Sequence, residues 1–315
     1  TMKKKAIIIS LKGKTLSKKE KMLLAKESPW GVILFKRNIY SLKQIQRLTQ
    51  EIKKYSKSKN FPILIDEEGS TVSRLKDIFN HHLNANFFGK IFEKDKKSAK
   101  FIYKNYLKSL CNLLKIIGIN INTIPVLDVL RKNTSKIIGS RSFSYNKEIV
   151  KILGDITVRE CQKHKIISVI KHIPGHGCAT QDSHIFLPKV NLSEKNLNLI
   201  DFYPFKSNSA KLAMTAHILF SKIDNNNVST FSKKIINKII RKKIGFKGIL
   251  MSDDISMKAL KYDLVTNAKK ALEAGCNLVL YCDGNIKDNL KLIKSVPYID
   301  KFTAKKTSEI YKILR

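Results

Sequence analysis

The segment Gly248-Ile-Leu-Met-Ser-Asp253 is a short apolar run that ends directly in a carboxylate. Strands of a parallel sheet read as nearly continuous apolar runs, because helices cover both faces of such a sheet. Seven other β-rich runs are bounded by turn residues, and most of them are nearly continuous apolar runs as well. They are Ala6–Ser10, Gly31–Phe35, Pro62–Asp66, Ile119–Val126, Ile166–His172, Lys211–His217 and Cys276–Asp283. The sequence therefore predicts eight buried parallel strands.

Segments with helical periodicity separate these strands. In the clearest one, residues 97–117, apolar side chains recur at three- to five-residue steps until Gly118 ends the helix. The basic segment from Lys301 to Arg315 is predicted as the last helix. This alternation indicates the α/β class and a single (β/α)8 TIM-type barrel that forms one domain over residues 1–315. An open doubly wound sheet is the alternative, but residues 11–19 lack the glycine-rich turn that such a sheet normally carries.

Polar residues stand at the C-terminal ends of the predicted strands. They are Asp66, Asp128, Lys171, His172, His217, Asp253 and Asp283. A (β/α)8 barrel carries its chemistry on the face where its strands end. We therefore expect these side chains to converge on one pocket.

The chain is strongly basic, with 61 Lys and Arg against 25 Asp and Glu and a formal charge of +36. Clustered basic residues would suggest nucleic-acid binding, because they neutralise phosphates. Here the lysines are spread along the whole chain, so we expect a solvated basic surface and no specific nucleic-acid partner. No stretch approaches the roughly 18 apolar residues of a membrane helix. We therefore expect a cytoplasmic protein without a membrane partner.

The loop after the fifth predicted strand has the sequence Lys171-His-Ile-Pro-Gly-His-Gly-Cys-Ala-Thr-Gln-Asp-Ser-His184. Asp182 precedes His184 by two residues, and a carboxylate oriented on an imidazole gives a proton carrier that titrates near neutrality. Metal binding by the three histidines of this loop is an alternative. However, the helical H-E-x-x-H arrangement is absent and the five cysteines form no C-x-x-C pair, so no metal site is predicted.

The predicted strand from Gly248 ends in Asp253, and a second carboxylate, Asp254, follows directly. We expect Asp254 to cap a helix that starts near Ile255, which leaves Asp253 to face the pocket. Glycosidases need one carboxylate that attacks or stabilises an oxocarbenium-like centre and a second group that protonates the leaving oxygen. Asp253 and His184 supply these two functions.

Sugar hydroxyls are bound by charged side chains that form paired hydrogen bonds. Candidates are Asp66 and Arg74 in I-D-E-E-G-S-T-V-S-R, Arg141 in I-I-G-S-R-S-F, and Lys171. Taken alone, each of these residues is also typical of an ordinary ion pair.

Together these motifs resemble the β-N-acetylglucosaminidase branch of glycoside hydrolase family 3, and they occur in the order found in that family. The most specific match is K-H-I-P-G-H-G at Lys171 followed by D-S-H at Asp182. The other matches are Gly31-Val-Ile-Leu-Phe-Lys-Arg-Asn38, D-E-E-G at Asp66 with Arg74, Pro125-Val-Leu-Asp128, Ile138-Gly-Ser-Arg-Ser-Phe143, Met214-Thr-Ala-His217 and Ser252-Asp253-Asp254. Ser70 and Cys178 depart from the pattern, which often has glycine and aspartate there.

The resemblance implies a retaining exo-β-N-acetylglucosaminidase without a cofactor. In this family pattern Asp253 is the nucleophile and His184 is the acid/base, assisted by Asp182. The terminal N-acetylglucosamine is held by Asp66, Arg74, Arg141, Lys171 and His172. Such enzymes act in the cytoplasm on muropeptide fragments during peptidoglycan recycling, where they remove N-acetylglucosamine from 1,6-anhydro-N-acetylmuramic acid. We also expect a monomer.

Other functions remain open from the sequence. A β-glucosidase or a β-N-acetylglucosaminide phosphorylase of the same family is the nearest alternative, since a histidine acid/base does not repel a phosphate nucleophile as a carboxylate would. A nucleic-acid-binding protein would explain the charge but neither the histidine-rich loop nor the strand-end carboxylates. A non-catalytic sugar-binding barrel would explain the sugar-binding groups, but the nucleophile and the acid/base are both present.

Overall fold

The computed structural model describes residues 3–182 and 186–315. Within them, eight parallel strands close into a barrel in the order β1-β10-β9-β7-β5-β4-β3-β2. They are β1 (Lys5–Ser10), β2 (Pro29–Leu34), β3 (Ile63–Ile65), β4 (Ile121–Asn122), β5 (Ile167–Ile173), β7 (Leu212–Thr215), β9 (Ile249–Asp254) and β10 (Leu278–Leu280). Each overlaps one of the predicted segments, so the prediction of a TIM-type barrel is confirmed.

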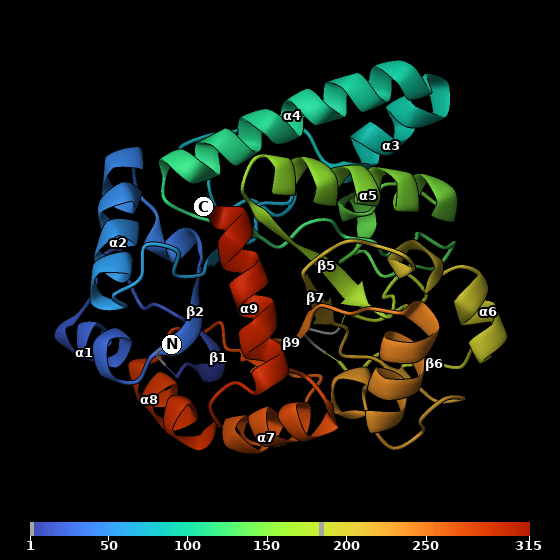
Figure 1. The fold of residues 1–315 in the computed structure, drawn as a ribbon. Helices are drawn as coiled ribbons and strands as arrows, with labels where there is room; N and C mark the ends of the chain where they lie inside the picture. Colours follow the sequence, from blue (N-terminus) through green and yellow to red (C-terminus); the bar gives the residue numbers. More distant parts are fainter. Residues whose placement is uncertain (1–2, 183–185) are drawn as a thin grey trace.

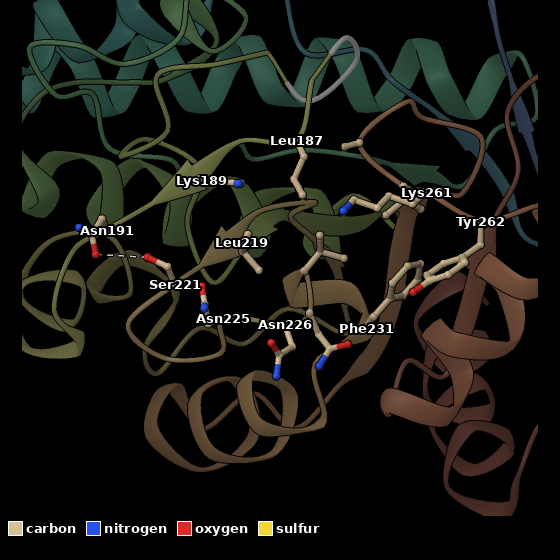
Figure 2. A pocket seen from close by; sticks show the side chains of 14 residues that line it. Leu187, Lys189, Asn191, Leu219, Ser221, Asn225, Asn226, Phe231, Lys261 and Tyr262 are labelled. Atoms are coloured by element: carbon tan, nitrogen blue, oxygen red, sulfur yellow. Dashed lines mark hydrogen bonds between the residues drawn. The ribbon is translucent and has the colours of Figure 1, made fainter.

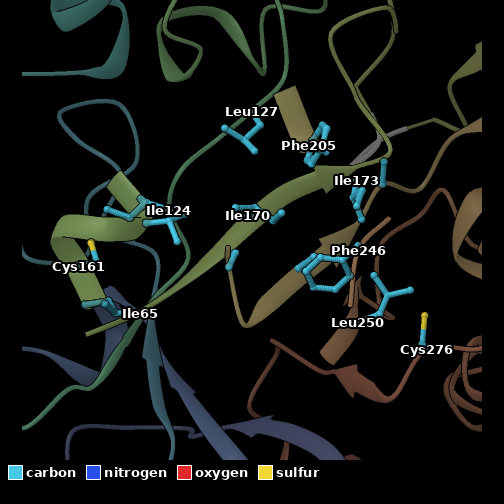
Figure 3. Packing of buried hydrophobic residues seen from close by; sticks show 14 of the residues in the cluster. Ile65, Ile124, Leu127, Cys161, Ile170, Ile173, Phe205, Phe246, Leu250 and Cys276 are labelled. Atoms are coloured by element: carbon cyan, nitrogen blue, oxygen red, sulfur yellow. The ribbon is translucent and has the colours of Figure 1, made fainter. Parts of the chain in front are cut away.

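Alternate side chains of the strands divide the core into two clusters. One side of each strand fills the barrel interior, which contains Ala6, Ile8, Trp30, Ile33, Leu64, Ile121, Ile167, Val169, Leu212, Met214, Ile249, Met251, Leu278 and Leu280. The other side packs against the surrounding helices and loops. Figure 3 shows part of this outer cluster, in which Ile170 and Ile173 of β5 contribute to the same cluster as Leu127 and Phe205.

Helices surround the barrel (Figure 1). They are α1 (Lys18–Lys26), α2 (Leu42–Tyr55), α3 (Ala85–Lys94), α4 (Lys96–Ile116), α5 (Lys147–Lys163), α6 (Glu194–Leu199), η5 (Ile235–Ile244), α7 (Leu264–Ala274), α8 (Ile286–Ser295) and α9 (Lys301–Leu314). The helix predicted over residues 97–117 is α4, and Gly118 after it adopts a left-handed φ of 80°. None of the helices described is long and apolar enough to cross a membrane.

The last helix, α9, closes the N-terminal end of the barrel. Its Ile310 packs within the interior cluster, and Tyr311 lies against the same cluster. Trp30, near the start of β2, donates its indole N–H to Thr307 Oγ1 of α9 at 2.9 Å. With this end covered, the C-terminal ends of the strands remain as the open face of the barrel.

A small sheet that the sequence did not predict follows two of the barrel strands. It pairs β6 (Lys189–Val190) with β8 (Leu219–Phe220) in parallel. Each strand has only two residues, which is too short for an alternating pattern to be recognised. The sheet joins the segments that follow β5 and β7 on the open face.

Candidate active site

The polar residues predicted at the strand ends lie at one edge of neighbouring strands. Asp66 comes directly after β3, Lys171 and His172 lie in β5, His217 follows β7, and Asp253 lies near the end of β9. The strands β3, β4, β5, β7 and β9 are consecutive neighbours in the barrel. The parallel arrangement therefore places these side chains on the same face of the molecule.

Lys171 is the centre of a buried ion-pair network on this face. Its side chain is only 3% exposed, and its ammonium nitrogen lies 2.6 Å from Glu68 Oε1 and 3.7 Å from Asp66 Oδ1. The ammonium group also donates to Thr123 Oγ1 at 2.8 Å. Because an ammonium group has three N–H donors, these partners fix the direction of the Lys171 side chain.

Two arginines complete the network. Arg74 donates to Asp66 Oδ2 at 2.8 Å, and Arg141 donates to both carboxylate oxygens of Glu68 at 2.7 and 2.9 Å. Burial alone would raise the pKa of both carboxyl groups, but the neighbouring cations outweigh burial. The pKa of Asp66 lies well below its usual range and that of Glu68 falls to about 2. Both carboxylates are therefore ionised at neutral pH.

Asp128 connects the site to the loop after β5. It is fully buried, its Oδ2 lies 2.7 Å from His172 Nδ1, and its Oδ1 accepts from the backbone N–H groups of His172 and His176 at 3.2 and 2.6 Å. Burial raises the pKa of Asp128, but these partners outweigh it and hold the pKa below its ordinary value. An ionised carboxylate only accepts hydrogen bonds, so Nδ1 of His172 carries the proton and Nε2 is the acceptor in the neutral ring.

Asp253 is a half-buried carboxylate near the end of β9. Its Oδ1 accepts a hydrogen bond from the backbone N–H of Asp254 at 2.8 Å. Burial raises its pKa, but the two histidines His217 and His172, the Asp254 backbone N–H and Lys171 together outweigh burial. The pKa of Asp253 therefore lies below the ordinary value of an aspartate. Asp253 is therefore ionised at neutral pH.

His217 is buried beside Asp253 and is held in one tautomer. Its Nε2 donates to the backbone carbonyl of Asp254 at 3.0 Å, and its Nδ1 lies 2.7 Å from Thr230 Oγ1. Because a carbonyl only accepts, Nε2 carries the proton and Nδ1 accepts from the hydroxyl. Burial lowers the pKa of His217, which favours this neutral form.

Asp254 does not have the role that the sequence predicted. No helix starts near Ile255, because residues 255–263 form turns and α7 begins only at Leu264, where Asp263 is the N-cap. Asp254 instead accepts hydrogen bonds from the backbone and hydroxyl of Ser256 and from the backbone N–H of Cys282. Its carboxylate fixes the turn after β9 against the end of β10. The expectation that Asp253, rather than Asp254, faces the pocket stays a prediction.

Asp283 lies apart from these contacts. It is exposed, and its carboxylate accepts a hydrogen bond from the Tyr281 hydroxyl at 3.4 Å. No described ion pair connects Asp283 to the Lys171 network. The expectation that Asp283 joins the other strand-end polar groups in one pocket stays a prediction.

Comparison with known proteins defines the family. The model of the glycosyl hydrolase family 3 N-terminal domain matches residues 2–307. The chain belongs to glycoside hydrolase family 3. The family 3 enzyme is similar to the β-hexosaminidase of Psychromonas ingrahamii, with 31% identity over 304 residues that cover 93% of this chain and 88% of that protein. A β-hexosaminidase of Neisseria meningitidis is 34% identical over 274 residues, covering 85% of this chain and 75% of that protein.

Solved structures agree with this assignment. NagZ from Neisseria gonorrhoeae, crystallised with N-trifluoroacetyl-D-glucosamine, matches with a TM-score of 0.89 and 30% identity over 98% of this chain and 90% of that one. A family 3 β-N-acetylglucosaminidase from Paenibacillus matches with a TM-score of 0.85 and 26% identity, covering 98% of this chain and 60% of that one. The family 3 enzyme is therefore a glycoside hydrolase with the barrel of its β-hexosaminidase relatives.

The histidine-rich loop of the family 3 enzyme starts from a tightly packed base. Gly175 has a left-handed φ of 139°, and a Cβ at this position would lie 2.8 Å from the Cβ of Asp201. At Gly177 a Cβ would collide with the backbone carbonyl of Val129. Both glycines are thus required by close packing, which anchors the first half of the loop.

The second half of this loop carries the predicted acid/base. Asp182 is half-buried, whereas His184 lies outside the described residues. The pairing of Asp182 with His184 therefore stays a prediction. Among the residues described, no group of three or more His, Cys, Asp or Glu side chains is arranged to hold a metal ion.

Three residues of the site were not assigned a role from the sequence. Glu68 binds both Arg141 and Lys171, Asp128 binds His172, and Thr123 accepts from Lys171. Glu68 was visible as the third acidic residue of D-E-E-G, and Asp128 as a strand-end carboxylate, but neither pattern names a partner. Nothing in the sequence distinguishes Thr123, because its role depends on the approach of β5 to β4.

His176 gives the family 3 enzyme a predictable sensitivity to acid. Burial lowers its pKa to about 4, although Asp128 opposes this, while an unfolded histidine titrates near 6.5. Between these pH values the unfolded chain takes up a proton that the folded protein does not, so acid favours unfolding by up to about 1.4 kcal/mol per pH unit. We expect His176→Gln to flatten the pH dependence of the unfolding free energy between about pH 6.5 and 4 in urea titrations. His82→Gln, at an exposed position, serves as the control. If the unfolding free energy of His176→Gln depended on pH as steeply as that of the wild type, His176 would not be the source of the acid sensitivity.

Proposed function

We propose that this enzyme is a retaining exo-β-N-acetylglucosaminidase that forms a covalent glycosyl intermediate on Asp253. The observation that carries the proposal is the ionised, half-buried carboxylate of Asp253 at the strand ends where the Lys171 network also lies. Curated relatives named β-hexosaminidase support the acetamido sugar as substrate. The NagZ structure that holds N-trifluoroacetyl-D-glucosamine supports it as well.

In the proposed mechanism an Asp253 oxygen attacks the anomeric carbon while the glycosidic C–O bond breaks. His184 gives its proton to the leaving oxygen, and Asp182 orients the imidazole. Water then attacks the glycosyl–Asp253 ester, His184 takes a proton from this water, and the Asp253 carboxylate is released. Two successive displacements retain the β configuration. A histidine suits both proton transfers because its unperturbed pKa of about 6.5 lies near working pH.

The terminal N-acetylglucosamine is held by Asp66, Arg74, Arg141, Lys171 and His172 in this proposal. The ionised Asp66 accepts hydrogen bonds from sugar hydroxyls, and Arg74 beside it donates them. Lys171 and Arg141 are each less than 10% exposed, and Glu68 forms an ion pair with both. The network thus presents donors and acceptors whose directions are set before the sugar arrives, which favours binding.

We further propose that residues 1–315 form one catalytic domain that acts as a monomer in the cytoplasm and needs no cofactor. The substrates would be muropeptide fragments of peptidoglycan recycling, in which N-acetylglucosamine is linked to 1,6-anhydro-N-acetylmuramic acid. The order and completeness of the family motifs support this assignment. No specific nucleic-acid or membrane partner is proposed.

A pair of chromogenic substrates tests the proposed reaction. We expect hydrolysis of an aryl β-N-acetylglucosaminide and at least about 100-fold lower kcat/KM for the matching β-glucoside, because the site would leave polar groups unpaired without the acetamido group. Phosphate should not accelerate release of the aryl group or produce a sugar 1-phosphate. A preference for glucose, or formation of the sugar phosphate, would replace the proposal with one of the family alternatives.

A further inference from the structure

Arg74, which the proposed function assigns to the sugar, is held at three points. Its guanidinium group donates a hydrogen bond to Asp66 Oδ2 at 2.8 Å, and the guanidinium carbon lies 5.1 Å from the centroid of the Phe35 ring. Its backbone N–H donates to Glu67 Oε2 at 2.8 Å. Within the described residues Nε of Arg74 has no hydrogen-bond partner, so one donor of the guanidinium group remains unused.

The side chain of Glu67 fixes the backbone that carries Arg74. Residues 66–84 connect β3 to α3 without any helix or strand, so their conformation depends on turns and on side-chain hydrogen bonds. The same Oε2 atom of Glu67 also accepts from the backbone N–H of Leu75 at 3.0 Å. One carboxylate oxygen thus holds two consecutive backbone N–H groups, the first of which belongs to the residue that presents the guanidinium group.

Glu67 is itself anchored to the barrel. Its backbone N–H donates to Asn122 Oδ1 at 3.0 Å, and Asn122 Nδ2 donates to the Glu67 carbonyl at 2.9 Å. Asn122 is the fully buried last residue of β4. Because the backbone of Glu67 is fixed to this strand, its carboxylate fixes Arg74 relative to the barrel.

The Glu67 carboxylate has no other described role. The residue is fully buried, and within the described part of the chain its Oε1 atom has no hydrogen-bond partner. His81 Nε2 lies 3.7 Å from this oxygen, which is beyond hydrogen-bond range. Burial of a carboxyl group costs free energy that an apolar side chain would not. The hydrogen bonds that this side chain is described to accept therefore all serve the Arg74 segment.

The partners of Arg74 belong to one part of the open face. Phe35 follows β2, Glu67 follows β3 and Asn122 ends β4, and these three strands are neighbours. A groove of about 500 Å³ belongs to another part, because its lining comes from the segments that follow β5, β7 and β9 (Figure 2). None of the partners of Arg74 lines this groove. A substitution at Glu67 therefore acts on the Arg74 segment without changing the lining of the groove.

We propose that Glu67 is a positioning residue, which holds the backbone at Arg74 so that the guanidinium group is in place before the sugar binds. The proposal rests on the proposed function, since that function assigns Arg74 to the sugar. Glu67 acts through Arg74, because its own carboxylate is buried and its described hydrogen bonds go to residues 74 and 75. Without this acceptor the Arg74 segment would become ordered only on binding, and the free energy of ordering would weaken sugar binding.

Two substitutions at Glu67 test this role on an aryl β-N-acetylglucosaminide. Glu67→Leu removes the acceptor at similar size, whereas Glu67→Gln keeps an oxygen that accepts from the same two N–H groups. We expect Glu67→Leu to raise KM about tenfold with kcat within about threefold of the wild type, because the reacting groups are untouched. The KM of Glu67→Gln should stay within about twofold of the wild type. If Glu67→Leu does not fold, Glu67→Asp withdraws the carboxylate by one methylene group and should raise KM in the same way.

A double variant separates action through Arg74 from a general loss of stability. In a protein that already carries Arg74→Ala, Glu67→Leu should not raise KM further, because the residue through which Glu67 acts is absent. Glu20→Leu is the matched control, since the buried Glu20 carboxylate accepts from the backbone N–H groups of Lys12 and Ser17 in the loop between β1 and α1. We expect Glu20→Leu to lower the urea midpoint of unfolding, as Glu67→Leu does, and to leave KM unchanged.

Amide hydrogen exchange measures the same contact without a substrate. Exchange at the backbone N–H groups of Arg74 and Leu75 should be faster in Glu67→Leu than in the wild type. Unchanged exchange there, an unchanged KM in Glu67→Leu and Glu67→Asp, or an equal rise in KM with and without Arg74 would overturn the assignment of Glu67. A rise in KM of the same size in Glu20→Leu would overturn it as well. Failure of the wild type itself to hydrolyse the substrate would instead refute the proposed function, and the exchange measurement would still decide whether Glu67 holds the Arg74 segment.

Discussion

The kcat of the variant Asp253→Ala on an aryl β-N-acetylglucosaminide is expected to be roughly 10⁴-fold or more below that of the wild type, because the variant lacks the proposed nucleophile. The other carboxylates near the strand ends cannot substitute, because Asp66 and Glu68 are bound by cations. The fold should persist, since within the described residues the Asp253 side chain accepts a hydrogen bond from the adjacent Asp254 N–H alone. We expect its unfolding free energy in urea to change by less than about 1 kcal/mol.

The neighbouring Asp254 offers a matched control. Asp254→Asn keeps the size of the side chain and one acceptor oxygen for the turn formed with Ser256 and Cys282. We expect a loss of about 1 kcal/mol in stability and a kcat within about tenfold of the wild type. If Asp254→Asn lost activity and Asp253→Ala kept it, the roles of the two carboxylates would have to be exchanged.

The variant Asp128→Ala is expected to lose about 3–5 kcal/mol of stability. Its carboxylate is fully buried and bonds to two backbone N–H groups and to His172 Nδ1, so truncation leaves buried donors without their acceptor. Urea denaturation of Asp128→Ala and of the milder Asp128→Asn measures this loss. Because His172 also loses its orientation, KM for the acetamido sugar should rise in the milder variant.

An exposed aspartate that accepts as many hydrogen bonds as Asp128 serves as the control for the effect of burial. Asp95 caps α4 and accepts from the backbone N–H groups of Lys97 and Ser98 and from the Ser98 hydroxyl. Asp95→Ala should cost only about 1 kcal/mol, because water replaces the lost acceptor. Equal losses in Asp128→Ala and Asp95→Ala would show that the buried network does not contribute as described.

The barrel could be predicted because its strands are locally distinctive. Segments such as Gly248–Asp253 are apolar throughout, and Gly118 marks a helix end that the structure places correctly. The strands β6 and β8 escaped prediction because two residues carry no periodicity. The turn after β9 was taken for a helix because Asp254 resembles an N-cap, whereas Asp263 takes that role nine residues later.

The site was only partly visible in the sequence. Residues such as Asp66, Lys171 and Asp253 stand at strand ends, where their position alone indicates chemistry. Their partners depend on distances between strands, so the pairing of Lys171 with Glu68 required the closed barrel. The pairing of Asp128 with His172 also joins residues 44 positions apart in the sequence.

Trapping of the glycosyl intermediate tests the central proposal most directly. A fluorinated β-N-acetylglucosaminide with a good leaving group slows hydrolysis of the intermediate, and mass spectrometry of the proteolysed enzyme locates the sugar. We expect one N-acetylglucosamine derivative on the peptide that contains Asp253. Consumption of the reagent with this peptide unmodified, or with the sugar on another carboxylate, would contradict it.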